Sequence, residues 1–186
     1  MQNKGIGLKA EKGKRVVALF PFFLILTLVT LTLIRPTVLW IEESDGDGHT
    51  GRAVFFLNPG EEFAISYTHS VDLLPVVEIY YSDGESIYLK ETHFRNFGAG
   101  MGLLEGRGRY VEEEGLLKIV GIDEKLDSFI LRVGLIADQR LLYRGSEYVL
   151  AGFFGEDARL LFQVKKIPLY KALAEDAFSG KPEKLR

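Results

Sequence analysis

The feature that most constrains this chain is an uncharged, strongly apolar run of 19 residues from Val16 to Ile34. The hydrocarbon core of a bilayer is about 30 Å thick, and a helix needs about 20 apolar residues to cross it. The run therefore predicts a transmembrane helix over residues 16–34. The remainder of the chain must then fold outside the lipid.

The charges on either side of this run predict its orientation. Residues 1–15 form a basic leader with five lysine or arginine residues and one acid, Glu11. Because positive charge accumulates on the cytoplasmic side, we expect a cytoplasmic N-terminus and an extracytoplasmic chain after Arg35. The leader therefore carries a net charge of +4. Because the whole chain carries −3, residues 16–186 carry −7. Such an acidic outer domain argues against nucleic-acid binding and against docking on anionic lipid headgroups.

A cleaved signal peptide is the main alternative interpretation, and a buried helix of a soluble domain is a weaker third one. A signal peptide would have a shorter apolar core followed by a small-x-small cleavage site. After Ile34 the sequence continues Arg-Pro-Thr-Val-Leu-Trp, which contains no such site and no cysteine for a lipid. The sequence therefore favours an uncleaved signal anchor and a single-pass protein of the cell membrane. Trp40 is either an interfacial anchor or a core residue of the first strand.

Residues 37–167 have the composition of one all-β domain on the extracytoplasmic side. Short segments rich in aromatic and β-branched residues alternate with turn signals, at a spacing typical of a small antiparallel sandwich or barrel. The predicted strands are Thr37–Glu42, Ala53–Leu57, Phe63–Ser70, Val76–Tyr81, Ile87–Phe94, Arg109–Glu112, Leu116–Ile122, Phe129–Leu135, Arg140–Tyr143, Tyr148–Gly152 and Leu160–Lys165.

Residues 168–186 are predicted to form a short C-terminal helix and a tail. Pro168 precedes the helix, and Ser179-Gly180 follows its expected end at Phe178. Leu169, Leu173 and Ala177 form an apolar stripe that we expect to dock on the β-domain.

The stretch from Phe63 to Met101 contains two of the three histidines. An Asp83-Gly84 turn would place Glu78 opposite Leu89 and Leu74 opposite His93, and a loop over residues 72–75 would place His69 opposite Glu78. Alternate residues of a strand share a face, and directly paired residues do so too. The face predicted from these registers carries Tyr67, His69, Glu78, Tyr80, Glu91 and His93.

Three of these side chains are candidate metal ligands. His69, Glu78 and His93 would supply two imidazoles and a carboxylate, a set suited to zinc. A His69–Glu78 hydrogen bond that holds the hairpin is the simpler interpretation. The chain has no cysteine, which excludes thiolate catalysis and cysteine-ligated metal. No cofactor is expected.

Three further motifs are weak. Asp45 to Gly51 contains Asp-x-Asp-Gly but lacks the other ligands of a calcium loop, so it predicts a plain turn. The glycine-rich segment 97–108 lacks the helix of a dinucleotide fingerprint and favours a bulge or a backbone crossing. Ser70 could be a hydrolase nucleophile, but strand alternation points it away from His69 and no elbow motif surrounds it.

The central stretch resembles an uncharacterised bacterial and archaeal domain family, a domain of unknown function encoded beside the permeases of TAXI-type TRAP transporters. The resemblance spans Val38 to Phe162. It is carried by Tyr67, His69, Ser70, Val71, Pro75 and Glu78, and then by Gly98, Ala99 and Gly100.

This resemblance implies an exported accessory protein of a small-organic-solute uptake system, with a TRAP permease or its solute-binding protein as partner. It implies no catalytic residues, and we do not expect an enzyme. The alternatives from the residues themselves are a small-ligand or metal-binding domain and, more remotely, a serine hydrolase.

Overall fold

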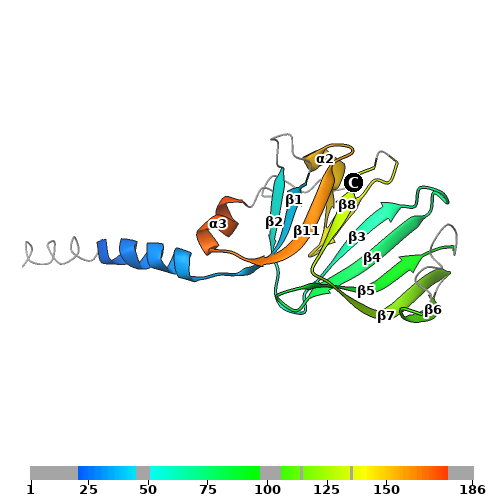
Figure 1. The fold of residues 1–186 in the computed structure, drawn as a ribbon, viewed down its shortest axis with the longest axis horizontal. Helices are drawn as coiled ribbons and strands as arrows, with labels where there is room; N and C mark the ends of the chain where they lie inside the picture. Colours follow the sequence, from blue (N-terminus) through cyan, green and yellow to red (C-terminus); the bar gives the residue numbers. More distant parts are fainter. Residues whose placement is uncertain (1–20, 45–50, 97–105, 114, 135, 176–186) are drawn as a thin grey trace, which may run out of the picture.

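The fold of the β-domain is a sandwich of two antiparallel sheets (Figure 1). The computed structural model describes residues 21–44, 51–96, 106–113, 115–134 and 136–175. Its strands are β1 (Thr37–Glu43), β2 (Arg52–Phe56), β3 (Glu62–Thr68), β4 (Pro75–Ser82), β5 (Ile87–Phe94), β6 (Arg109–Glu113), β7 (Leu116–Leu126), β8 (Ser128–Arg132), β9 (Arg140–Tyr143), β10 (Ser146–Val149) and β11 (Arg159–Lys166). This confirms the all-β class.

The two sheets differ in width. One has the order β2-β1-β11-β8, and the other has the order β10-β9-β3-β4-β5-β7-β6. Only Asp127 separates β7 from β8, so the chain passes from the wide sheet to the narrow one almost without a turn. We call the face of the wide sheet that meets the narrow sheet the inner face, and the opposite one the outer face.

The core between the sheets contains a column of stacked aromatic rings. Phe63 of β3 and Tyr80 of β4 stack at 5.3 Å between ring centroids, and Tyr80 stacks on Phe129 of β8 at 4.9 Å. Phe129 then stacks on Phe162 of β11 at 4.6 Å. The column joins the inner faces of both sheets, so these four rings hold the two layers together.

The sandwich has two distinct ends. At one end, the β4–β5 turn approaches the start of β1, because Gly84 lies against Pro59 and Thr37 and Lys166 reaches Glu85 at 3.5 Å. The loop between β3 and β4 lies at the other end of β4, which is an eight-residue strand about 25 Å long. We call this loop, residues 69–74, the distal loop (Figure 1).

A helix over residues 21–33 extends away from the sandwich before β1 (Figure 1). Its large apolar side chains are exposed, from Val29 at 43% to Leu33 at 73%, apart from Leu31, which is half-buried. Within the described part of the chain, no helix combines the length and hydropathy needed to cross a bilayer. Residues 16–20 of the predicted anchor lie outside the described residues, so the anchor stays a prediction.

The C-terminal helix α3 (Leu169–Ala174) docks on the outer side of the narrow sheet, although not through the predicted stripe. Ala172 is buried in a small cluster with Val38, Trp40, Val54 and Ile167. Leu173 is 55% exposed, and Ala177 lies outside the described residues. Trp40 is therefore a core residue of β1. The predicted stripe was wrong at Leu173 because the short helix presents its alanine, not its leucine, to the sheet.

Three strand boundaries also differ from those predicted. β7 continues through residues 123–126, because Gly121 and Asp123 adopt positive φ inside the strand and do not end it. The predicted strand over Phe129–Leu135 ends at Arg132. The strand predicted to end at Gly152 ends at Val149, and the apolar run that follows forms a short helix, α2 (Leu150–Phe154). The sequence could not distinguish the two, because a short apolar run is compatible with a strand or a helix.

Candidate functional site

The hairpin of β3 and β4 brings two motif residues together, in a register that differs from the predicted one. Ile65, not His69, lies opposite Glu78. The hairpin closes on His69, whose N–H donates to the Leu74 carbonyl oxygen at 2.8 Å. The predicted register was wrong by four residues. Because four is an even number, Tyr67 and Glu78 still share a face.

The register between β4 and β5 was also predicted wrongly. Glu78 lies opposite Thr92, and His93 lies opposite Val77 and not opposite Leu74. A bulge at Lys90 adds one residue to β5, and a shift of one residue exchanges the two faces of a strand. Thr92 therefore joins Glu78 on the inner face. Glu91 and His93 turn to the outer face.

Glu78 is the centre of a polar network on the inner face. The Tyr67 hydroxyl donates to Glu78 Oε1 at 3.2 Å, and the Tyr80 hydroxyl donates to Oε2 at 2.6 Å. Thr92 lies opposite Glu78 on the neighbouring strand β5 and is fully buried, and among the described residues its Oγ1 has no hydrogen-bond partner. Tyr67 and Glu78 are both motif positions. Their hydrogen bond links β3 to β4 beside the distal loop, so this part of the motif has a structural role.

The same network shifts the titration of its tyrosines. Burial raises the pKa of Tyr80 far above its ordinary value of about 10, and the Glu78 carboxylate raises it further. Burial and Glu78 also raise the pKa of Tyr67. Both tyrosine hydroxyls therefore stay protonated and remain hydrogen-bond donors to Glu78.

The three predicted metal ligands are not brought together. Glu78 is on the inner face and His93 is on the outer face, where its Nε2 lies 3.0 Å from Glu91 Oε2. His69 is at the base of the distal loop, with Nδ1 at 3.9 Å from an Asp72 carboxylate oxygen. The described residues contain no group of three or more histidine, aspartate or glutamate side chains that could hold a metal ion.

The distal loop exposes apolar side chains on a well-fixed backbone. Val71 is 68% exposed and Leu73 is 62% exposed. The Leu73 N–H donates to the His69 carbonyl oxygen at 2.9 Å, and Leu73 adopts a positive φ of 54°. The Thr68 N–H donates to the carbonyl oxygen of Ala137, next to Ile136, which is 69% exposed. Two bonded loops therefore present three exposed apolar residues at this end.

Sequence reasoning did not identify this surface. Val71 is a motif position, but the predicted loop covers residues 72–75 and leaves Val71 outside it. The available signal was the sequence Val71-Asp72-Leu73, in which apolar residues occupy turn positions that are usually polar. Ser70 lies exposed in the same loop. The motif positions Gly98, Ala99 and Gly100, like Asp45 to Thr50, lie outside the described residues.

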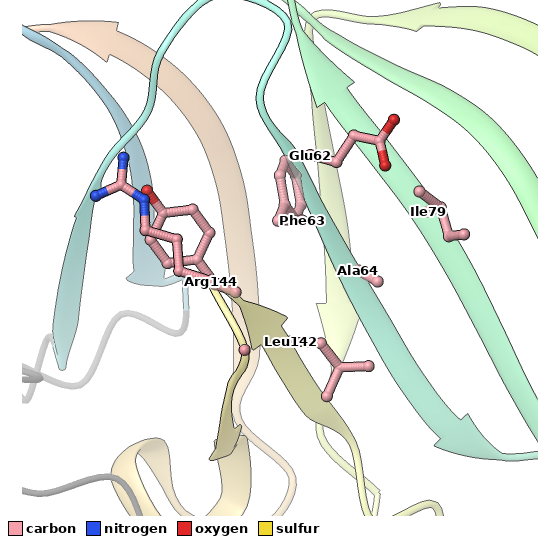
Figure 2. A pocket seen from close by; sticks show the side chains of 8 residues that line it. Glu62, Phe63, Ala64, Ile79, Leu142 and Arg144 are labelled. Atoms are coloured by element: carbon pink, nitrogen blue, oxygen red, sulfur yellow. The ribbon is translucent and has the colours of Figure 1, made fainter.

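A shallow hollow of about 230 Å³ lies on the outer face beside the β9–β10 turn (Figure 2). Ala64, Ile79 and Leu142 form its apolar part. Arg144 lies at its edge and donates to Glu61, which holds the pKa of that carboxyl at about 2. None of the predicted site residues lines this hollow, so it does not account for the motif.

We expect the stability of the domain to fall steeply above pH 10, and Tyr80 to cause part of this fall. Between pH 10 and its raised native pKa, Tyr80 keeps its proton in the folded state but loses it on unfolding. This difference lowers the free energy of unfolding by about 1.4 kcal/mol per pH unit. Urea unfolding at several pH values measures the slope. Tyr80→Phe should have a shallower slope above pH 10, and identical slopes would contradict the assignment.

Comparison with known proteins places this site in an uncharacterised domain. Residues 63–150 match the family model described as Domain of unknown function (DUF1850). The matched segment contains the distal loop and the whole Glu78 network. No curated protein and no solved structure matches the chain. The expected uncharacterised domain is thus confirmed over these residues.

Proposed function

We propose that this chain is a membrane-anchored extracytoplasmic accessory protein of a TRAP-type organic solute uptake system, and that its distal loop docks a protein partner of that system. The observation that carries the proposal is the exposure of Val71 and Leu73 on a hydrogen-bonded loop. Large apolar side chains held rigidly at a loop tip lose little conformational entropy when they are buried by a partner.

The anchor part of the proposal is supported by the apolar run over residues 16–34 and by its basic leader. In the described part of this run, the large apolar side chains of the helix are exposed except for the half-buried Leu31. A helix that is apolar on every side requires an apolar environment. An uncleaved anchor would keep the domain at the membrane that contains the permease, and would so raise its effective concentration near that complex.

The position of the distal loop indicates which side of the complex it contacts. The β4–β5 turn lies beside the start of β1, where the chain leaves the helix, and the distal loop lies at the other end of β4. The apolar residues of the distal loop therefore lie on the side of the domain that faces away from the membrane, about one strand length further from it than the β4–β5 turn. A solute-binding protein that approaches from outside suits this geometry better than the membrane-embedded part of a permease.

The TRAP association comes from the sequence motif of Tyr67, His69, Val71, Pro75 and Glu78. Three of these residues form or flank the base of the distal loop, and Val71 is at its tip. A motif that builds and carries one exposed loop fits recognition of a common partner better than catalysis. Fold and motif are associational support, and the partner must be tested directly.

We expect Val71→Asp combined with Leu73→Asp to abolish partner binding without unfolding the domain. Full burial of an aliphatic side chain is worth about 1.5–3 kcal/mol, and each 1.4 kcal/mol changes affinity tenfold. The tagged full-length chain would be purified from gently solubilised native membranes, and the TRAP permease and solute-binding protein would be quantified by mass spectrometry. The expected result is a loss of at least about tenfold in recovery of one of them.

Ile130→Asp provides a matched control. Ile130 is 53% exposed on β8, away from the distal loop, so it tests a new charge on an exposed apolar residue. The control should retain the partner. Equal recovery with the control and with the double variant would overturn the docking role, and absence of both transport proteins from the wild-type preparation would overturn the accessory role.

A further inference from the structure

Helix α3 is fixed beside the end of the apolar helix. The Leu169 N–H donates to the Ile34 carbonyl oxygen at 2.9 Å, and the Ile167 N–H donates to the Pro36 carbonyl oxygen at 3.4 Å. In the same region Thr37 pairs with Lys166 across β1 and β11. The start of α3 is therefore bonded to the residues that follow the apolar helix, and Figure 1 shows α3 beside the end of that helix.

The two sides of α3 have different environments. One side buries Ala172 against Trp40, and the Arg52 guanidinium donates to both Glu175 carboxylate oxygens at 2.8 and 2.9 Å. The other side leaves Tyr170 52% exposed and Leu173 55% exposed. These two side chains add to the exposed apolar surface that begins in the apolar helix and continues through Leu33 and Ile34.

Basic side chains outnumber acidic ones at this end of the domain, although the outer domain as a whole is acidic: the described residues here include Arg35, Arg52, Lys165, Lys166 and Lys171, against Glu42, Glu85 and Glu175. The Lys165 and Lys171 ammonium groups lie 4.7 and 5.3 Å from the Trp40 ring centroid. Arg35, Lys166 and Lys171 are all exposed. The net charge of the domain, which argued against contact with anionic lipid, therefore does not describe the surface next to the apolar helix.

From this juxtaposition we propose that α3 lies in the headgroup region of the membrane that holds the apolar helix. Tyr170 and Leu173 contact the boundary between headgroups and acyl chains, and Arg35 and Lys171 face anionic headgroups, whereas Lys166 pairs with Glu85. Tyrosine suits this boundary because its ring is apolar and its hydroxyl is polar. The positive charges of the basic residues attract them to an anionic lipid surface. The inference rests on the anchor in the proposed function and adds a second contact that fixes the tilt of the domain.

The test is tryptophan quenching in the full-length chain reconstituted into vesicles of phosphatidylcholine and phosphatidylglycerol with brominated acyl chains. Tyr170→Trp should show a loss of fluorescence, relative to non-brominated vesicles, well beyond that of the wild type with its buried Trp40. Tyr110→Trp on β6 is the control, because Tyr110 is 38% exposed in the wide sheet, far from α3. It should match the wild type.

Flotation of the same vesicles separates this inference from the anchor itself. A Tyr170→Trp chain that floats with the vesicles but shows no additional quenching would overturn the lipid contact of α3 and leave the anchor intact. A chain that fails to float would overturn both. Additional quenching that is lost in vesicles of phosphatidylcholine alone would confirm the contribution of the basic residues to the contact.

Discussion

Phe162→Ala is expected to lower the free energy of unfolding by about 3–5 kcal/mol, the usual cost of removing a buried aromatic ring. Phe162 is fully buried and forms the end of the ring column that joins the two sheets. Its loss leaves a cavity beside Phe129 and removes contacts between the layers. Urea unfolding of the detergent-solubilised chain, followed by near-ultraviolet circular dichroism, measures the change.

Tyr88→Ala is the control for this result. Tyr88 also stacks on an aromatic residue, Tyr81, at 4.9 Å, but it does so on the outer face of the wide sheet. Cross-strand pairs of this kind contribute about 0.2–1 kcal/mol. If both substitutions cost the same, the column of rings does not hold the sheets together in the way described.

Glu78→Ala is expected to lower the free energy of unfolding by about 2–6 kcal/mol, because each of two largely buried donors left without an acceptor costs about 1–3 kcal/mol. Those donors are the Tyr67 and Tyr80 hydroxyls. Removal of the carboxylate also breaks the hydrogen bond from Tyr67 that links β3 to β4 beside the distal loop. Urea unfolding measures the stability, and proteolysis near residue 71 measures the loosening of the loop.

Glu91→Ala separates a network effect from a general effect of losing a carboxylate. Glu91 lies on the neighbouring strand but on the outer face, where it contacts His93 and Lys90. Pairs at a surface contribute about 0–1 kcal/mol, so this variant should be close to wild type. A Glu78→Ala protein as stable as Glu91→Ala would show that the inner network does not support the hairpin.

The sequence predicted the all-β class and most strands, because aromatic and β-branched segments bounded by turn residues are local signals. It did not predict register. The β4–β5 turn places Ser82 opposite Ile87, and Asp83 Oδ1 accepts hydrogen bonds from the N–H groups of Glu85 and Ser86. This turn is two residues longer than the expected Asp83-Gly84 turn, and its side-chain bonds leave no periodic signal.

The predicted assignment of side chains to the two faces of the wide sheet was right for some residues and wrong for others. Tyr67, Glu78 and Tyr80 share a face as expected, because an error of an even number of residues preserves alternation. His93 was assigned to the wrong face, because the bulge at Lys90 shifts the register of β5 by one residue. No glycine or proline at this position indicates a bulge in the sequence. The exposed apolar tip of the distal loop depends on where the hairpin closes, which tertiary contacts decide.

The distal loop is proposed to contact an extracytoplasmic partner of a TRAP uptake system. This contact is tested most directly by a photo-crosslinking amino acid placed at position 71 of the full-length chain in intact cells, with the same probe at position 130 as reference. We expect position 71 to crosslink to the solute-binding protein or the permease and position 130 to crosslink to neither. Equal crosslinking from both positions, or a functional protein with no crosslink from position 71, would contradict it.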